Sequence, residues 1–166
     1  MSIFKAYDIR GVVPDQLDNE DAYRIGRATA RFLGVSEVVI GRDARSSSPA
    51  LGEALVRGVT REGVEVVDIG LVATPMLYFA VDRLEAGGGI MLTASHNPAE
   101  YNGFKICRAN AVPIGENSGL KEIESHYAQL ESAGTDEGSS PPKIRQVDVV
   151  SEYVDHALSV GEGRPS

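Results

Sequence analysis

The chain has 166 residues, of which 42% are hydrophobic and 24% are charged, so it suits one folded domain of ordinary size and not a disordered protein. Its net charge of −8 is supplied entirely by residues 61–166, because residues 1–60 carry eight basic and eight acidic side chains. This acidic balance argues against nonspecific binding to nucleic acid or to an anionic membrane, but it leaves room for a small phosphorylated ligand.

Hydrophobic periodicity and turn residues predict strands and helices that alternate along the chain. In order, the sequence predicts an extended segment over 3–13, a helix over 19–33, a strand over 38–40, a helix between Ser48 and Gly63, a strand over 64–69, a helix over 74–84, a strand over 90–92 and a second strand after the loop at 97–102, a helix over 120–130, an extended piece over 144–150 and a helix over 151–158. The residues expected to cap helices at their N-termini are Asn19, Ser48, Thr74 and Ser118.

Short connections between alternating strands and helices are typical of an α/β fold, here a three-layer α/β/α sandwich with a mixed, mostly parallel sheet. The strands on either side of the 97–102 loop are close in sequence, so we expect them to pair antiparallel. Residues 132–143 are rich in Gly, Ser and Pro and predict a loop or linker, and the helix after them has no visible continuation.

The sequence also limits where the protein works. No apolar run reaches the length of a membrane helix, and Met1–Lys5 lack the basic start and apolar core of a signal peptide. The single cysteine, Cys107, excludes an internal disulfide framework and fits a reducing compartment. We therefore expect a cytoplasmic protein that binds neither membranes nor nucleic acid.

Several chemically active side chains follow the strand over 90–92, in the stretch Thr93–Pro98. Ser95 is either a nucleophile or part of a turn in which its hydroxyl and the amide of Asn97 satisfy backbone groups. His96 is either catalytic or a solvent-exposed loop residue, because adjacent side chains on an extended backbone point apart. Local chemistry alone leaves these alternatives open.

Two further cations are candidates for the same site. Lys105 lies in the next strand, where Phe104 and Ile106 are expected to face the core and Lys105 the opposite side. It is either a site residue or a solvated one. Arg10 either binds a phosphate through its fixed fork of donors or only pairs with Asp8.

The loop Gly41–Arg45 follows another strand and indicates a structural Arg–Asp pair or, through Arg45 near a helix N-terminus, an anion contact. Loops at the carboxyl ends of strands share a crevice in α/β sheets, so this loop and the Ser95 loop are expected to lie together. The three histidines and the one cysteine lack the spacing of a zinc site.

Three motifs occur in a specific order. They are Tyr7-Asp8-Ile9-Arg10-Gly11, then Gly41-Arg42-Asp43-x-Arg45, then Thr93-Ala94-Ser95-His96-Asn97-Pro98-x-x-Tyr101-Asn102-Gly103-x-Lys105. This combination resembles the N-terminal domain of the α-D-phosphohexomutases, and the phosphomannomutase/phosphoglucomutase branch is the most similar. The resemblance covers roughly residues 3–150, and the Ser95 motif is its most diagnostic part.

The resemblance implies that Ser95 carries a phosphoryl group, donates it to a hexose monophosphate and is rephosphorylated from the other end of the resulting hexose 1,6-bisphosphate. It implies that Mg²⁺ bridges the Ser95 phosphate and acidic ligands of a second domain. His96 and Lys105 match positions that transfer protons or orient the reacting hydroxyl. The match also places Tyr7, Arg10 and Asn97 in the substrate cleft and makes Arg42 and Asp43 scaffold residues of the loop.

A complete member of this family has four domains, with an Asp-Gly-Asp-x-Asp metal loop in the second, a sugar-selecting loop in the third and a phosphate-binding loop in the fourth. We expect residues 1–147 to form domain 1 and residues 148–166 to begin domain 2, so the missing C-terminal domains would be the partners of this chain. The isolated chain is then expected to be inactive, and mannose or glucose preference is not set by it. Gly115–Gly119 resembles the sugar loop, but Leu120 stands where a histidine is expected.

Two other functions stay open at this stage. One is a noncatalytic module that binds a sugar phosphate or a partner chain. The other is a serine hydrolase, although no Gly-x-Ser-x-Gly elbow surrounds Ser95.

Overall fold

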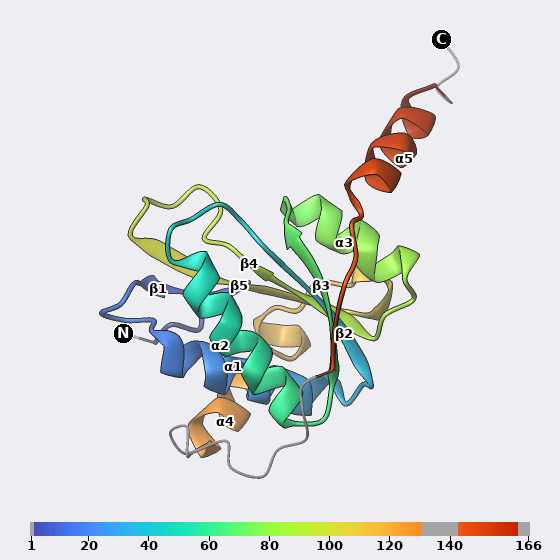
Figure 1. Ribbon diagram of the computed structural model, residues 1–166. Coiled ribbons are helices and arrows are strands. Elements are labelled where there is room, and N and C mark those ends of the chain that lie inside the picture. Colours follow the sequence, from blue (N-terminus) through green and yellow to red (C-terminus); the bar gives the residue numbers. More distant parts are fainter. Residues whose placement is uncertain (1, 131–142, 163–166) are drawn as a thin grey trace.

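The computed structural model describes residues 2–130 and 143–162, which form a six-stranded sheet with helices on both faces (Figure 1). The strands are β1 (Ile9–Val12), β2 (Glu37–Arg42), β3 (Glu65–Leu71), β4 (Gly88–Leu92), β5 (Tyr101–Arg108) and β6 (Ile144–Gln146). The helices are α1 (Asn19–Leu33), α2 (Ser48–Arg61), α3 (Thr74–Arg83), α4 (Leu120–Gln129) and α5 (Val150–Glu162), with 3-10 turns η1 (Ala109–Ala111) and η2 (Glu116–Ser118). The predicted alternation of strands and helices is confirmed.

The strands lie in the order β1-β5-β4-β2-β3-β6. β2 pairs in parallel with β3 and β4, and β3 pairs in parallel with β6. β5 pairs antiparallel with both β1 and β4, so it is the one strand of the described residues that runs against the rest. The predictions of a mixed, mostly parallel sheet and of an antiparallel pair around the loop at 97–102 are both confirmed.

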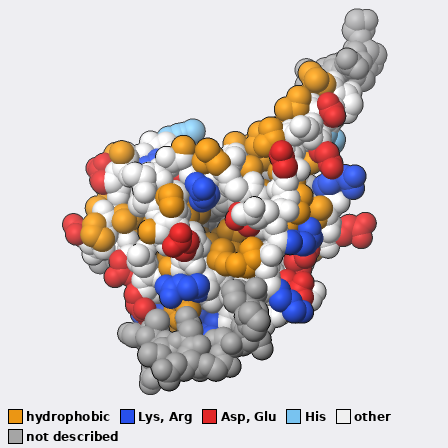
Figure 2. Space-filling model, viewed as in Figure 1, with side chains coloured by type: hydrophobic (Ala, Val, Ile, Leu, Met, Phe, Trp, Pro, Cys, Tyr) orange, Lys and Arg blue, Asp and Glu red, His pale blue; other side chains and the backbone are white. Residues whose placement is uncertain are grey.

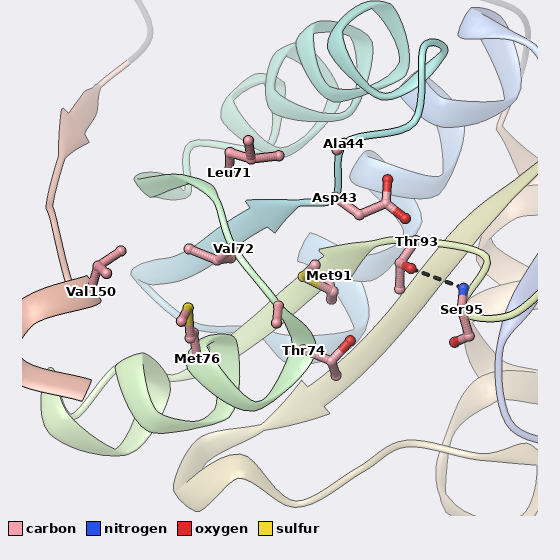
Figure 3. A pocket seen from close by; sticks show the side chains of 11 residues that line it. Asp43, Ala44, Leu71, Val72, Thr74, Met76, Met91, Thr93, Ser95 and Val150 are labelled. Atoms are coloured by element: carbon pink, nitrogen blue, oxygen red, sulfur yellow. Dashed lines mark hydrogen bonds between the residues drawn. The ribbon is translucent and has the colours of Figure 1, made fainter. Parts of the chain in front are cut away.

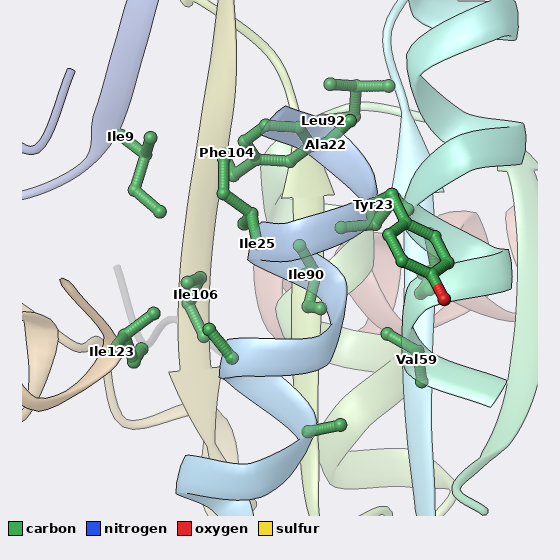
Figure 4. Close-up of a cluster of buried hydrophobic side chains, with 14 of the residues drawn as sticks. Ile9, Ala22, Tyr23, Ile25, Val59, Ile90, Leu92, Phe104, Ile106 and Ile123 are labelled. Atoms are coloured by element: carbon green, nitrogen blue, oxygen red, sulfur yellow. The ribbon is translucent and has the colours of Figure 1, made fainter. Parts of the chain in front are cut away.

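Two hydrophobic cores cover the two faces of the sheet. One packs α1, α2 and α4 against strand residues that include Ile90, Phe104 and Ile106 (Figure 4). The other packs α3 against residues that include Val39 and Met91. Neighbouring residues of one strand enter different cores, because successive side chains of a strand point to opposite faces of the sheet. The result is the predicted three-layer sandwich.

The helices α1 and α2 cross at two glycines that bring their backbones together. A Cβ atom at Gly58 would lie 2.1 Å from the carbonyl oxygen of Tyr23, and one at Gly26 would lie 2.4 Å from that of Leu55. Side chains at these positions would force the helices apart. Glycine at both positions therefore sets the spacing of this helical layer.

Two of the predicted helix caps are wrong, one because the preceding residue caps the helix and the other because the serine side chain bonds to a different residue. The N-cap of α1 is Asp18 and not Asn19, since the Asp18 carboxylate accepts from the backbone N–H of Asp21 at 2.9 Å and the two residues form a capping box. Ser48 is the first residue of α2 and does not cap it, because its hydroxyl donates to Asp43 Oδ1 at 2.7 Å.

The two other predicted caps are also displaced by one residue. Thr74 is the first helical residue of α3, and Ala73 precedes it in an extended conformation without a side-chain cap. The N-cap of α4 is Gly119, whose φ of 134° suits glycine, and not Ser118. The Ser118 hydroxyl instead accepts from the backbone N–H of Gly115 at 2.7 Å, so it stabilises η2.

The segment at residues 3–13 is not one extended strand, which corrects the prediction. An antiparallel bridge pairs Phe4 with Ile9, so the chain folds back on itself before β1 begins. Tyr7 lies in the bend, and 82% of its surface is exposed.

The C-terminal segment contains the short strand β6 and the helix α5, where an extended piece and a helix were predicted. In Figure 1, α5 stands away from the sheet, and its Tyr153 ring lies 5.6 Å from that of Phe79 in α3. Hydrophobic side chains continue from the body of the domain onto α5 in Figure 2, and Val154 and Leu158 are among those exposed. Nearly all of the predicted linker at 132–143 lies outside the described residues, and the domain boundary near residue 147 stays a prediction. None of the described helices is long and apolar enough to cross a membrane.

Candidate functional site

Ser95 lies in the loop that joins β4 to β5, where the parallel strands β2 and β4 end. Its φ of 54° is in the left-handed region, which side chains other than glycine seldom adopt. The Ser95 N–H donates to Thr93 Oγ1 at 2.9 Å, and the Ser95 carbonyl accepts from Arg45 at 2.9 Å. The Ser95 side chain is exposed, and its hydroxyl makes no hydrogen bond with the described residues. The backbone is therefore fixed while the hydroxyl stays available.

Arg45 holds this loop through both of its terminal nitrogens. Its Nη1 and Nη2 atoms donate at 2.7–3.0 Å to four backbone carbonyl oxygens, those of Ser95, Asn97, Pro98 and Tyr101. Its Nε atom lies 3.2 Å from Asp43 Oδ2, and only 15% of the side chain is exposed. The four Nη N–H groups are therefore all used by the loop, and Nε is left to form the ion pair with Asp43. Arg45 is the partner in the predicted Arg–Asp pair, and none of its Nη donors remains for the alternative anion contact.

The Arg45 guanidinium and the four carbonyls that it holds form a clamp on the loop. Asp43 connects this clamp to the interior of the domain. Its Oδ1 atom accepts from the Ser48 hydroxyl at 2.7 Å and from the backbone N–H of Arg45 at 3.1 Å. The Ser48 hydroxyl in turn accepts from Asn102 Nδ2 at 3.0 Å, and Asn102 is fully buried in β5. The start of α2, the end of β2 and the start of β5 are thus joined by hydrogen bonds to the loop that carries Ser95.

Three charged side chains lie in register beside the loop. Arg10 in β1 is paired with Gly103 in β5, whose carbonyl accepts from the residue two positions before Ser95. Lys105 is paired with Met91 in β4. Asp8 lies between the cations, with carboxylate oxygens 3.5 Å from Lys105 Nζ and 4.0 Å from Arg10 Nη2. Two cations and one carboxylate leave one net positive charge, which suits a phosphate group.

Lys105 lies on the side of the sheet that alternation predicted. Phe104 and Ile106 are 0% and 3% exposed and face the core under α1 and α2. The Lys105 side chain points to the opposite face and is 27% exposed. The strand β5 therefore supplies the core on one face and a candidate site cation on the other.

A cavity of about 550 Å³ opens beside the Ser95 loop (Figure 3). Ser95 and Thr93 line one end of it together with Asp43, and Leu71 and Val150 line the opposite end. Val150 is the first residue of α5, so the cavity lies between the sheet edge and that helix. Its size fits a small molecule, and its lining changes from polar at Ser95 to apolar at α5.

The other predicted site residues differ in what they contact. His96 is exposed, and neither its imidazole nor the half-buried Arg42 guanidinium has a hydrogen bond or ion pair with the described residues. The Asn97 amide donates to the carbonyl of Ala94 at 2.8 Å, so it serves the turn. Tyr7 lines a separate hollow of about 300 Å³ beside η2. Asp43 lies beside Ser95 and Tyr7 lies apart, and the catalytic and substrate-binding roles of these residues stay predictions.

The sequence predicted no site role for Ser48 and Asn102, and it indicated Asp8 only as a partner of Arg10 and not of Lys105. Asp8 is two positions from Arg10, a spacing that places both on one face of a strand and was the available signal. Ser48 was interpreted as a helix cap, which is the commoner role of a serine before proline. Asn102 is a polar residue in a strand that is otherwise mostly buried, and a buried amide needs hydrogen-bond partners.

The geometry also limits the chemistry of the described residues. They contain no group of three His, Cys, Asp or Glu side chains placed to hold a metal ion. Asp43 lines the cavity with Ser95, and its carboxylate contacts the Ser48 hydroxyl and Arg45. Burial raises the pKa of the Cys107 thiol to about 11, so this thiol is not a nucleophile at neutral pH. No described base bonds to the Ser95 hydroxyl in the way that a serine hydrolase requires.

Known proteins resemble this chain in sequence and in fold. The family model described as phosphoglucomutase/phosphomannomutase, alpha/beta/alpha domain I, matches residues 1–134. A phosphomannomutase of Escherichia coli is 44% identical over 158 residues, which cover 95% of this chain and 34% of that protein. A phosphomannomutase of Klebsiella pneumoniae is 44% identical over 155 residues, which cover 93% of this chain and 98% of that protein. The crystal structure of a phosphoglucomutase/phosphomannomutase family protein from Burkholderia thailandensis gives a TM-score of 0.79 at 36% identity, over 95% of this chain and 35% of that one. The chain thus spans about a third of the length of the Escherichia coli and Burkholderia proteins.

Proposed function

The chain belongs to the phosphoglucomutase/phosphomannomutase family, whose α/β/α domain I it contains, and from this premise we propose that it supplies the phosphoserine of a hexose phosphate mutase. The whole protein would interconvert the 1-phosphate and the 6-phosphate of mannose or glucose. Ser95 would carry the phosphoryl group between the two positions. The other domains of such a mutase would be needed for turnover.

The observation that carries this proposal is the presentation of Ser95. Its hydroxyl is exposed at one end of a cavity, while its backbone is held by Thr93 and Arg45. A phosphoryl carrier needs this combination, because it must reach the substrate and still sit in one fixed geometry. Arg10 and Lys105 lie beside the loop and leave a net positive charge where phosphate oxygens would gather.

In the proposed reaction, a hydroxyl oxygen of the hexose monophosphate forms a bond to phosphorus while the bond from phosphorus to Ser95 Oγ breaks. The proton of the attacking hydroxyl passes to a base, for which the unpaired imidazole of His96 is the candidate. The ammonium of Lys105 donates to the oxygens that gain charge, and Arg10 contributes positive charge beside it. The hexose 1,6-bisphosphate then turns round and returns its other phosphoryl group to Ser95.

The proposed reaction also includes Mg²⁺, which would neutralise charge on the transferring phosphoryl group when it is bound. Apart from the phosphate of Ser95, the described residues contain no group of three His, Cys, Asp or Glu side chains placed to hold this ion. Mg²⁺ prefers six oxygen ligands. The remaining protein ligands would therefore lie outside the residues described.

The test replaces Ser95 by Ala in the full-length protein and measures conversion of mannose 1-phosphate and glucose 1-phosphate. We expect the rate to fall by at least about a thousandfold, because the covalent carrier is removed. Ser46→Ala is the matched control, since Ser46 is an exposed serine of the neighbouring loop and should leave the rate unchanged. Phosphopeptide mapping after incubation with hexose 1,6-bisphosphate should locate the phosphate on Ser95.

Full activity of Ser95→Ala would overturn the assignment of the carrier. Binding of a hexose phosphate without conversion by the unaltered full-length protein would favour a noncatalytic module instead. Covalent labelling of Ser95 by an active-site serine probe would favour a hydrolase.

A further inference from the structure

We propose that Arg45 is a positioning residue of phosphoryl transfer, which holds the Ser95 loop in its reactive conformation before substrate binds. This role rests on the proposed function of Ser95. Arg45 would not touch substrate. It would act through the carbonyl oxygens of the loop.

All four Nη N–H groups of the guanidinium bond to backbone carbonyls of the loop, and Nε lies 3.2 Å from Asp43 Oδ2. The Nη groups that would bind a phosphate are therefore all in use. A substrate-binding arginine would instead keep part of its fork open toward the cavity.

The positions of the four acceptors also favour a role in holding the loop. The four carbonyls belong to residues 95, 97, 98 and 101, so they span the loop from the reactive serine to the first residue of β5. They converge on one planar group, which fixes their relative orientations. Ser95 keeps a left-handed φ of 54° within this span, and such a conformation persists only when its surroundings determine it.

The Arg45 side chain is itself anchored to the interior of the domain. Asp43 receives both the Nε atom and the backbone N–H of Arg45, and its Oδ1 atom also accepts from Ser48. Ser48 is bonded to Asn102, and both residues are fully buried. The loop is therefore tied through Arg45 to the rigid starts of α2 and β5.

Arg42 provides an internal contrast. It lies three residues before Arg45 at the end of β2, and its guanidinium has no hydrogen bond or ion pair with the described residues. A contribution that depends only on positive charge near the loop would be shared by both arginines. A contribution that depends on the fork of donors belongs to Arg45 alone.

The experiment compares Arg45→Lys with Arg42→Lys. Both changes keep the charge, but a lysine ammonium has three donors and cannot serve five acceptors. Amide hydrogen exchange of the 166-residue chain is followed at residues 94–102, and kcat and KM are measured in the full-length protein. For Arg45→Lys we expect exchange at least about tenfold faster in this loop, kcat lower by about a hundredfold and KM within about threefold of the unaltered value. For Arg42→Lys we expect no change in loop exchange, because the Arg42 guanidinium makes no hydrogen bond to the loop.

Unchanged loop exchange or unchanged kcat in Arg45→Lys would overturn the proposal. A loss confined to KM would do so as well, because it would make Arg45 a substrate ligand. If Arg45→Lys does not fold, Asp43→Asn takes its place, because it keeps the size of the side chain and weakens the contact with Arg45 Nε. This variant should give a smaller increase in loop exchange. Unchanged exchange in Asp43→Asn would also count against the positioning role of Arg45. The exchange measurement does not depend on the reaction, so a protein with no phosphate on Ser95 but with a loosened Arg45→Lys loop would refute the proposed function and leave the clamp standing.

Discussion

The two faces of the sheet are built from the same strands but carry different side chains. The face under α1, α2 and α4 is apolar across β1, β5, β4, β2 and β3, and its strand residues include Ile9, Phe104 and Ile90. The opposite face is apolar under α3, but beside the Ser95 loop it carries the partly exposed Arg10 and Lys105. Stability and chemistry are therefore divided between faces, and adjacent residues of one strand contribute to different properties.

This division allows the site to be charged without a charge in the core. Asp8, Arg10 and Lys105 neutralise one another in part on the open face, where water also screens them. Their neighbours in sequence bury apolar surface on the other face. Substitutions should accordingly separate into those that unfold the domain and those that affect only the candidate site.

The largest expected effect compares Phe104→Ala with Lys105→Ala. Phe104 is fully buried, so its truncation should lower the free energy of unfolding by about 3–5 kcal/mol. Lys105 is partly exposed and loses only its pair with Asp8, so Lys105→Ala should cost less than about 1 kcal/mol. Urea unfolding of the two variants measures the difference. Similar losses of stability would show that β5 does not divide its side chains between a core and a site.

A smaller effect is expected from the helical layer. Gly58→Ala places a Cβ atom 2.1 Å from the Tyr23 carbonyl oxygen and should destabilise the domain by about 1–3 kcal/mol as α1 and α2 move apart. Gly52→Ala in the same helix is the control, because its nearest neighbour is a Leu92 methyl group at 3.7 Å. That change should be neutral or stabilising by up to about 1 kcal/mol. Equal stability of the two variants would contradict the close crossing of the helices.

The sequence was sufficient to predict the order of strands and helices, because the local spacing of hydrophobic residues indicates each of them. The alternation of Phe104, Lys105 and Ile106 also predicted which side of β5 carries the site. Helix starts were predicted less well, since a serine or threonine before a helix can bond to partners distant in sequence. Ser48 shows this, because its hydroxyl bonds to Asp43 and Asn102 and does not cap α2.

Residues of the three motifs lie close together in the structure, but the hydrogen bonds and ion pairs that connect them could not be predicted from the sequence. The acceptors of Arg45 are backbone carbonyls, which carry no signature in the residue types that provide them. The pairing of Asp8 with Lys105 depends on the register between β1 and β5, which local patterns do not set. Hydrogen bonds join the motif around Arg45 to the motif around Asn102. Arg45 donates to the carbonyl of Tyr101, and Asn102 donates to the hydroxyl of Ser48.

The smallest expected effect concerns the outer surface of the helical layer, where charge contributes to stability and not to the site. Glu62 follows α2 and accepts from Nε of Arg27 at 2.7 Å and from Nε of Arg31 at 2.8 Å. Partial burial, the largest single influence, raises the pKa of Glu62, but the hydrogen bonds and positive charges of the two arginines together bring it below the ordinary value of 4.5. A carboxylate with a lowered folded-state pKa stabilises the fold above its unfolded pKa, and this contribution is lost as the pH falls through the folded value. Glu62→Gln should therefore be less stable than the unaltered chain by at most about 1 kcal/mol at pH 7. The difference in unfolding free energy should shrink as the pH is lowered below 4.5, and a difference that persisted at pH 3 would show that the carboxylate charge is not its source.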